Sequence, residues 1–301
     1  MDFRLFEARR LKASPFLRWA GGKQPFLARY GHLIPDFEGT YHEPFVGSAS
    51  VFLYVQARQS RPIKARLGDI NMPLALTLLA VRDSAYEVSD ALQNLAAFYL
   101  ASDNRVEFYR EVRDRYNAAL PRPNPADFIF LNRTCWNGLY RVNKAGKFNV
   151  PHGAHKGDPT FPTTDELLAV SAALQQASIR STTWQNSIHS ARPGDFVFLD
   201  PPYFSDLEQG AKYDRDTFPK LEHIELARSL KTLADNKVDF MLTNSGEEEI
   251  AAIYRQHGLH VRVSSVPRFI SSITSERTPA AEIIVTPNPL SEMSLFENGS
   301  H

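Results

Sequence analysis

Short apolar segments rich in β-branched and aromatic residues alternate along this chain with longer segments of helical periodicity. The expected strands are Tyr41–Glu43, Ile63–Gly68, Asp195–Leu199, Val238–Thr243, His260–Ser264 and Glu282–Thr286. The expected helices are Gln24–His32, Ala49–Gln59, Leu74–Val81, Ser89–Leu100, Glu107–Ala118, Asp165–Ala177, Leu221–Ala234 and Glu247–His257. Strands that alternate with helices predict a mostly parallel sheet covered by helices on both faces, which is the α/β class.

The middle of the chain departs from this alternation. Residues 83–163 have helical patterns followed by a polar stretch rich in Gly, Asn and Pro, and a Pro-rich connector is expected at Ala119–Asp127. We therefore predict an insertion, 83–163, between the two parts of one α/β domain, 1–82 and 164–287. Residues 288–301 are expected to form a loose tail.

Composition excludes several classes of protein. The 301 residues include 34 Lys and Arg against 34 Asp and Glu, so a nucleic-acid surface would have to be local. Cys135 is the single cysteine, which excludes a disulfide framework and a cysteine-rich zinc site, and no metal is expected. The charged N-terminus does not resemble a secretory signal, and the longest apolar run, Pro73–Val81, is about half of a membrane span. We expect a soluble cytoplasmic protein without a membrane partner.

One predicted strand ends in an unusual set of side chains. The sequence FVFLDPPYF runs from an apolar strand directly into Asp200, Pro201, Pro202 and Tyr203. Sheets of α/β proteins bind ligands outside the carboxyl ends of their strands. A carboxylate, carbonyls without a competing local N–H and an aromatic ring together suit a planar substrate that carries an amino group. A purely structural turn is the alternative.

Three earlier turns follow the pattern of a nucleotide-binding sheet. RWAGGKQ (18–24) places two glycines and a lysine before a helix, which suits an anion-binding turn but is not a Walker loop. YHEPFVGSASVF (41–52) reads as a strand, a glycine-containing turn and a helix, where a ligand could approach the backbone. LGDIN (67–71) ends the next strand with Asp69, where ribose hydroxyls would need an acceptor. The structural alternatives are two plain turns and, for Asp69, a helix N-cap.

The segment Phe130–Lys156 is locally basic. It contains no Asp or Glu, and basic residues, asparagines and aromatic residues are interleaved along it. Lys and Arg neutralise phosphates, while Arg and Asn bind guanine and adenine edges in the major groove. We predict that this segment contacts nucleic acid; a solvated basic loop is the alternative.

The order of these motifs resembles that of the Dam-like adenine-N6 DNA methyltransferases, the alpha group or D12 class. Asp200–Tyr203 is similar to the family's D-P-P-Y tetrapeptide, and WAGGK, EPFVGSASVF, DIN and NGLYRVNKAGKFNVPHG precede it in the family order. The resemblance runs from Phe16 to Thr286 and includes the final EIIVT. It implies a Rossmann-like, S-adenosylmethionine-dependent methyltransferase sheet. Residues 1–82 would be its cofactor-binding part, 164–287 its D-P-P-Y part, and 83–163 an inserted, mostly helical target-recognition domain.

The resemblance also implies roles for individual residues. The S-adenosylmethionine pocket would include Trp19, Lys23, Pro44, Phe45, Gly47, Asp69 and Asp200. The catalytic residues would be Asp200, Pro201, Pro202 and Tyr203. The DNA contacts would be Asn132, Arg133, Asn137, Arg141, Asn143, Lys144 and Lys147. Thr134–Trp136 and Phe269–Pro279 depart from the sequences of relatives, so base preference and the DNA contacts after Phe269 are not implied.

The implied reaction is methyl transfer from S-adenosylmethionine to the exocyclic amino nitrogen of an adenine flipped out of double-stranded DNA. The stretch NGLYRVN is similar to that of GATC-specific members, so GATC or a related short site is the expected sequence. Cytosine N4, an adenine in RNA, and an inactive regulator that binds the cofactor or DNA are alternatives. D-P-P-Y rather than S-P-P-Y favours adenine, and the intact Asp200 and Tyr203 disfavour the regulator.

The expected partner is double-stranded DNA. The sequence leaves open whether the enzyme stands alone or is paired with a restriction endonuclease or defence component that acts on the same site. We expect a monomer in the cytoplasm of a bacterial, archaeal or phage-infected cell.

Overall fold

The computed structural model describes residues 13–154, 157–203, 218–266 and 280–290. The chain divides into two compact units. The first unit comprises Met1–Lys23 and Val46–Trp184, and the second comprises Gln24–Phe45 and Gln185–His301. The expected loop after Phe269 lies outside the described residues, as does most of the expected tail.

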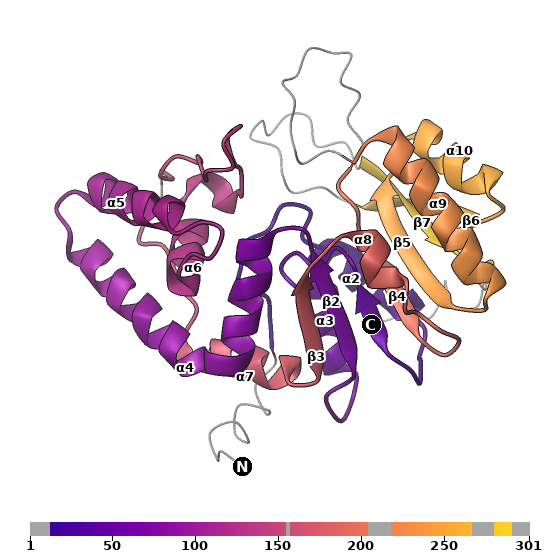
Figure 1. Cartoon of the computed structure of the whole chain (residues 1–301), viewed down its shortest axis with the longest axis horizontal. Coiled ribbons are helices and arrows are strands. Elements are labelled where there is room, and N and C mark those ends of the chain that lie inside the picture. The colour runs from indigo at the N-terminus through magenta and orange to yellow at the C-terminus, as the bar shows by residue number, and fades with distance from the viewer. Residues whose placement is uncertain (1–12, 155–156, 204–217, 267–279, 291–301) are drawn as a thin grey trace. The chain divides into compact units, whose positions relative to one another are not determined.

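The first unit contains two parallel strands and the long helices that pack beside them (Figure 1). Strands β2 (Ala65–Asp69) and β3 (Ala177–Ser181) pair with Leu67 opposite Ile179. The helices of this unit are α3 (Ser50–Ala57), α4 (Met72–Ala101), α5 (Arg105–Ala118), α6 (Pro125–Thr134) and α7 (Thr164–Leu174), with a 3-10 turn η2 at Trp136–Gly138. Helix α4 packs against α6 and α7, and α5 packs against α6.

Side-chain caps fix where these helices begin. Asn71, Asn104 and Asn124 each accept a hydrogen bond from a backbone N–H in the first turn of α4, α5 and α6, respectively. Thr163 and Glu166 form a reciprocal capping box at the start of α7. Such caps satisfy N–H groups that have no partner within the helix.

The second unit contains five strands in the order β1-β4-β5-β7-β6. Strands β1 (Tyr41–Glu43), β4 (Phe196–Leu199) and β5 (Asp239–Ser245) run parallel, and β7 (Ala280–Thr286) is antiparallel to both β5 and β6 (His260–Val266). The helical segments of this unit are α2 (Gln24–Tyr30), η1 (Gly31–Leu33), α9 (Lys220–Asp235) and α10 (Glu248–Gln256). The short α8 (Trp184–Ile188) begins at the boundary of the two units. Helices α9 and α10 pack against each other and against β5 and β6 (Figure 1).

The structure confirms the predicted α/β class. All six predicted strands form, and β4 is completely buried, as its apolar sequence indicated. Strand β3 was not predicted, because the helical pattern before it was extended to Ala177, whereas α7 ends at Leu174. Helix α6 was also missed, because its prolines indicated a connector, although Pro125 occupies the first helical turn, where proline is tolerated.

The start of the predicted insertion, at residue 83, falls at a kink in α4. Helix α4 runs through that boundary with a local break at Ser84, whose φ of −145° and ψ of 47° are not helical. The two helices predicted separately, Leu74–Val81 and Ser89–Leu100, correspond to the two halves of α4 on either side of this kink. The domain limits of the insertion stay a prediction.

No helix in the described part of the chain is long and apolar enough to cross a membrane. Among the same residues, no three His, Cys, Asp or Glu side chains are grouped so that they could hold a metal ion.

Candidate active site

The carboxyl ends of β1 and β4 lie next to each other in the second unit. Tyr41 pairs with Phe196 and His42 with Val197, although about 150 residues separate the two strands in the sequence. The turn Pro44–Phe45 follows β1, and Asp200 follows β4 directly. A sheet edge where neighbouring strands are far apart in sequence is a preferred ligand site in α/β proteins.

Strand β5 holds the backbone and the carboxylate of the D-P-P-Y segment. Thr243 donates its hydroxyl to Asp200 Oδ1 at 3.0 Å, and Asn244 donates from Nδ2 to the Pro201 carbonyl at 3.0 Å. Both donors follow from the parallel pairing of Leu199 with Leu242, which places them beside the segment. Asp200 is half-buried and Pro201 is buried. The positions of two predicted acceptor groups, the carboxylate and the carbonyl, are thus fixed by a buried strand.

The remaining two residues of the segment differ in environment. Pro202 is exposed, whereas Tyr203 is half-buried and donates its hydroxyl to Glu282 Oε1 at 2.6 Å. Thr243, Asn244 and Glu282 were not predicted as site residues. Only their place in neighbouring strands brings them to the segment, and no local motif in the sequence indicates it.

In the first unit, Asp69 ends β2 and binds two backbone N–H groups. Its Oδ2 accepts from Gly47 N at 3.1 Å, and its Oδ1 accepts from Asn71 N at 2.9 Å. Asn71, and not Asp69, caps the following helix, which decides against the N-cap alternative. Burial by the surrounding protein raises the pKa of Asp69 to about 6, although these N–H groups oppose the rise. At neutral pH the half-buried carboxylate is therefore ionised and able to accept further hydrogen bonds.

Two apolar surfaces accompany Asp69 in the first unit. Ile70, the next residue, is 79% exposed, which is unusual for a large aliphatic side chain at a strand end. Trp19 stacks with Phe128 and Tyr140 at centroid distances of 6.4 and 5.7 Å. Ile70 was not predicted as a site residue.

The turn after β1 passes close to Trp19. Gly47 has a φ of +48°, and a Cβ there would lie 2.9 Å from the Trp19 ring, so glycine is required on both counts. Lys23 is buried and reaches the Gly21 carbonyl of its own turn at 3.4 Å. In the second unit, Pro44 is buried and Phe45 packs edge-on against Phe218 at 5.8 Å.

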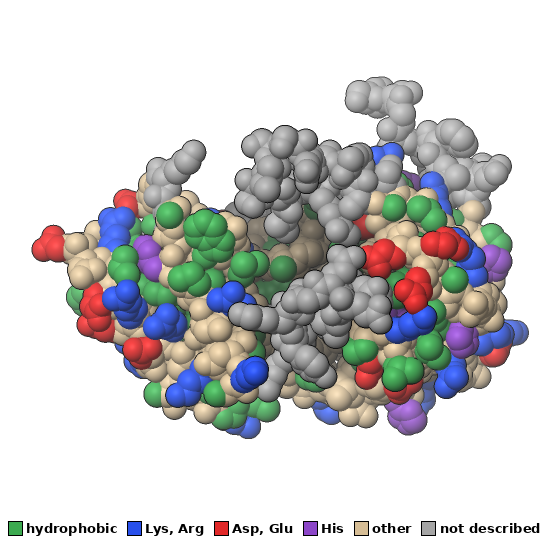
Figure 2. Space-filling model, turned by 90° about the horizontal axis from the view of Figure 1, so that it is seen from above, with side chains coloured by type: hydrophobic (Ala, Val, Ile, Leu, Met, Phe, Trp, Pro, Cys, Tyr) green, Lys and Arg blue, Asp and Glu red, His purple; other side chains and the backbone are tan. Residues whose placement is uncertain are grey.

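The locally basic segment forms a small hairpin. Val142 and Phe148 form an antiparallel bridge, and Asn143 Oδ1 accepts from Ala145 N and Lys147 N to hold the turn between them. The side chain of Asn117, on α5, exchanges two hydrogen bonds with the Phe148 backbone and so anchors the hairpin. Exposed predicted DNA contacts on this hairpin and just before it are Asn137, Arg141, Asn143, Lys144 and Lys147. On the face shown in Figure 2, basic and acidic side chains are intermingled over the described surface.

Several predicted DNA contacts are engaged within the protein. Asn143 holds the turn of the hairpin, and Arg141 donates to the side chain and the carbonyl of Asn149. Asn132 and Arg133 are engaged as well. Asn132 is 4% exposed; its Oδ1 accepts from Arg18 N, and its Nδ2 donates to the carbonyls of Arg18 and Gly138. Asn132 therefore joins the WAGGK turn to the start of the basic segment. Arg133 donates to the carbonyl and the hydroxyl of Thr160. The sequence could not distinguish these internal contacts from contacts with a base.

Cys135 is buried, and this burial raises the pKa of its thiol to about 12, so the thiol is protonated at neutral pH.

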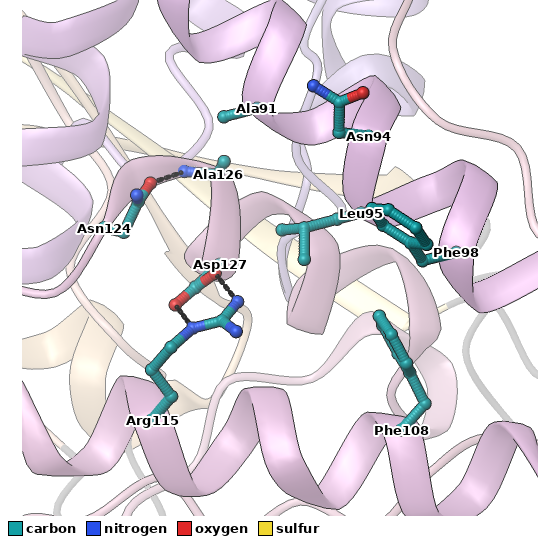
Figure 3. Close-up of a pocket in the computed structure, with 9 residues that line it drawn as sticks. All are labelled: Ala91, Asn94, Leu95, Phe98, Phe108, Arg115, Asn124, Ala126 and Asp127. Atoms are coloured by element: carbon teal, nitrogen blue, oxygen red, sulfur yellow. Dashed lines mark hydrogen bonds and ion pairs between the residues drawn. The ribbon is translucent and has the colours of Figure 1, made fainter.

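A cavity of about 370 Å³ lies elsewhere in the first unit, between α4, α5 and α6. Figure 3 shows Phe98 and Phe108 on one side of it and the paired Arg115 and Asp127 on another. Both Asp127 oxygens accept from the Arg115 guanidinium, at 2.6 and 2.9 Å, so this pair joins α5 to α6. None of the predicted site residues lines this cavity.

Comparison with known proteins identifies a family. Residues 19–266 match the family described as D12 class N6 adenine-specific DNA methyltransferase. A type II methyltransferase, M.MjaIII, of Methanocaldococcus jannaschii is 34% identical over 251 residues, which are 78% of this chain and 85% of that protein. The DNA adenine methylase of Escherichia coli K12 is 31% identical over 92% of this chain and 96% of its own length. A type II methyltransferase, M1.LlaDCHI, of Lactococcus lactis is 28% identical over 94% of this chain and 98% of its own.

Proposed function

This chain belongs to the D12 class of N6 adenine-specific DNA methyltransferases, and on that premise we propose that it uses S-adenosylmethionine to methylate an adenine flipped out of double-stranded DNA at GATC or a related short site. The observation that carries this proposal is the D-P-P-Y segment at the carboxyl end of β4, with Asp200 and the Pro201 carbonyl both held by β5. The segment offers acceptors for an amino group and a ring for stacking.

Asp69 and its surroundings fit the cofactor. Its ionised, half-buried carboxylate suits the two hydroxyls of a ribose, and the exposed Ile70 beside it suits the face of an adenine ring. The Gly47 turn, which lies against Trp19, would admit the methionine part close to the backbone. Lys23, Pro44 and Phe45 are assigned to the same cofactor. When bound, S-adenosylmethionine supplies a methyl group on a positively charged sulfur that is a good leaving group.

The residues around Asp200 would prepare the target amino group. The lone pair of the adenine amino nitrogen is delocalised into the ring, so it is a weak nucleophile. Hydrogen bonds from this group to the Asp200 carboxylate and the Pro201 carbonyl favour a pyramidal nitrogen with a directed lone pair. The bond from Asn244 leaves the Pro201 carbonyl a second lone pair for the base. Placement and electrostatics would therefore carry most of the rate.

DNA recognition is assigned to the basic hairpin and the turn before it. Arg141, Lys144 and Lys147 are exposed and suit phosphates or guanine edges, and Asn137 suits an adenine edge. Asn143 holds the turn through its Oδ1, so only the Nδ2 of this exposed side chain is left for DNA. The roles of Asn132 and Arg133 are revised, because Asn132 is buried, Arg133 is half-buried, and both bind protein groups. We propose that they fix the position of the segment and do not read bases.

The relatives named type II methyltransferases suggest that this chain, too, could act beside a cognate restriction endonuclease. The growth of a strain that lacks this methyltransferase separates this role from the role of an enzyme that acts alone. If a matching endonuclease is present in the host, loss of this methyltransferase alone should be lethal. Unaffected growth of the deletion strain would contradict the pairing.

Methylation mapping tests the proposed reaction. DNA from cells that express the protein is read by single-molecule sequencing, beside DNA from cells that express Asp200→Ala. We expect N6-methyladenine at one short motif in the first sample and none in the control. A mark on cytosine N4 would overturn the proposed base, and no mark on purified duplex DNA supplied with S-adenosylmethionine would overturn the proposed substrate.

A further inference from the structure

The hydroxyl of Tyr203 is held by a carboxylate from a distant part of the chain. Tyr203 Oη donates to Glu282 Oε1 at 2.6 Å, across 79 residues of sequence. Glu282 is 6% exposed, and its second oxygen, Oε2, is buried without a hydrogen-bond partner among the described residues. A buried carboxylate oxygen without a partner destabilises a protein. Stability alone therefore does not explain a glutamate at this place.

The neighbouring strands fix the position of the Glu282 backbone. It lies on β7 directly opposite Ser245 on β5 and Ser264 on β6, and Ser264 donates its hydroxyl to the Glu282 carbonyl at 3.1 Å. At the end of β5, Gly246 donates to the Ala281 carbonyl at 2.7 Å. A Cβ on Gly246 would lie 2.4 Å from Ala281 Cβ, so only glycine allows this close approach. The backbone that carries Glu282 is thus fixed from both sides.

The supports of Asp200 and Tyr203 lie on one face of the sheet. Residues opposite each other on paired strands project to the same face, as do residues two apart on one strand. Glu282 is opposite Ser245, and Thr243 is two residues before Ser245. Thr243 holds the carboxylate of Asp200, and Glu282 holds the ring of Tyr203. One rigid surface therefore sets the geometry between the amino-group acceptor and the stacking ring.

We propose that Glu282 is a positioning residue for methyl transfer, because its carboxylate fixes the plane of the Tyr203 ring against which the flipped adenine stacks. This inference rests on the proposed function. The prolines restrain the backbone before Tyr203 but do not themselves fix its χ1 and χ2. The hydrogen bond at the far end of the ring fixes these two angles before the base arrives. Stacking then needs no reorganisation of the tyrosine.

The test uses the full-length protein and a duplex that carries 2-aminopurine in place of the target adenine. The fluorescence of this base rises when it leaves the stack and is quenched when it stacks on an aromatic ring. Four variants are compared with the wild type: Glu282→Gln, Glu282→Ala, Tyr203→Phe, and the double variant Tyr203→Phe/Glu282→Ala. Glutamine is the matched control, because its side-chain oxygen can still accept from Tyr203.

We expect Glu282→Ala to lower kcat about tenfold while the KM for S-adenosylmethionine changes less than about twofold. The bound 2-aminopurine should be about twofold brighter, because the ring no longer quenches it fully. Glu282→Gln should stay within about threefold of the wild type in both measurements. In the Tyr203→Phe background, Glu282→Ala should change kcat by less than about twofold, because the two groups act through one bond.

Wild-type kcat and fluorescence in folded Glu282→Ala would overturn the inference and leave the proposed function intact. If that variant does not fold, Tyr203→Phe decides, because it removes the same hydrogen bond from a half-buried position. Wild-type values for Tyr203→Phe would then overturn the inference. A wild-type protein that neither methylates the adenine duplex nor brightens the 2-aminopurine duplex would overturn the proposed function instead.

Discussion

At the scale of single residues, the structure separates groups that hold the site from groups that would touch the substrate. Thr243, Asn244 and Glu282 each bind a member of the D-P-P-Y segment, and all three come from strands that are remote from it in the sequence. Asp200 would touch the target base directly. A substitution of Asp200 that preserves its bond with Thr243 should therefore separate chemistry from folding.

Asp200→Asn should lower kcat by roughly 100-fold or more, because a neutral amide stabilises developing positive charge on the amino nitrogen far less than a carboxylate does. The asparagine oxygen can still accept from Thr243, so the thermal midpoint should change little. Single-turnover methylation of a short duplex measures the effect, and Asp83→Asn, on the exposed side of α4, is a matched control. Turnover like that of the wild type would rule out the proposed role of Asp200.

The raised pKa of Asp69 predicts a pH dependence of cofactor binding. Below a pH of about 6 the carboxyl is protonated and accepts hydrogen bonds poorly, so affinity for S-adenosylmethionine should fall as the pH is lowered from about 8 to about 5. Calorimetric titration measures this, and Asp69→Asn should flatten the profile. An unchanged affinity across this range would contradict the assignment.

The same shift in the pKa of Asp69 gives the stability of the protein the opposite dependence on pH. Because the pKa is higher in the folded than in the unfolded protein, the contribution of Asp69 to stability is present below about pH 4. It is lost as the pH rises through about 6. Bound cofactor should therefore stabilise the protein more at pH 8 than at pH 5, since its hydroxyls would satisfy the ionised carboxylate.

At the scale of elements, one carboxylate ties the two strands whose ends form the D-P-P-Y site. Asp195, just before β4, accepts from Thr40 N at 2.7 Å, from His42 Nε2 at 3.1 Å and from Arg192 N at 3.0 Å. Burial alone would raise the pKa of Asp195, but these hydrogen bonds outweigh it, and the pKa lies below its ordinary value. These hydrogen bonds join β1 to the start of β4 beside the paired residues Tyr41 and Phe196.

Asp195→Ala should lower the free energy of unfolding by about 2–4 kcal/mol, because it removes the acceptor of two backbone N–H groups and the carboxylate partner of the buried His42. Urea denaturation at pH 7 measures this loss. In the wild type the contribution should be lost as the pH falls below about 4 and the carboxylate is protonated. Asp239→Ala, at the exposed start of β5, is the matched control. An equal loss of stability in this control would contradict a specific role of the Asp195 hydrogen bonds.

At the scale of the whole molecule, acidic and basic residues are equal in number, so the chain has no net charge that would attract DNA. Affinity for DNA therefore depends on where basic side chains are concentrated. The hairpin concentrates exposed basic side chains at a turn that Asn143 and Asn117 hold in shape. Each basic side chain that neutralises a phosphate releases counterions, so affinity should depend on salt in proportion to the number of phosphates neutralised.

The double variant Arg141→Gln/Lys147→Gln should weaken DNA binding and reduce the slope of log affinity against log salt by about 2, which is about 1 for each phosphate that is no longer neutralised. Fluorescence anisotropy over a range of salt concentrations measures the slope. Arg110→Gln removes an exposed charge from α5, away from the hairpin, and should leave the slope unchanged. A slope unaffected by the double variant would place DNA on another surface.

The sequence by itself determined the α/β class, the six strands it indicated, and the family to which the chain belongs. Local periodicity encodes strands and helices, and the family's motifs are short, contiguous and ordered along the chain. The sequence also placed Asp200 at a strand end and Asp69 at another, because an apolar run followed by a carboxylate is readable without any long-range interaction.

Only the tertiary structure decided what surrounds those residues. Glu282 approaches Tyr203 because β7 inserts beside β5, and Asn132 is buried because the Arg18 backbone passes over it. Both outcomes depend on strand pairing and packing between segments about 80 and 114 residues apart. The free energy of such an interaction depends on which residue is the partner. The residues next to Glu282 or Asn132 in the sequence do not specify that partner. A glutamate in EIIVT or an asparagine in FLNRT therefore has no assigned role until the chain is folded.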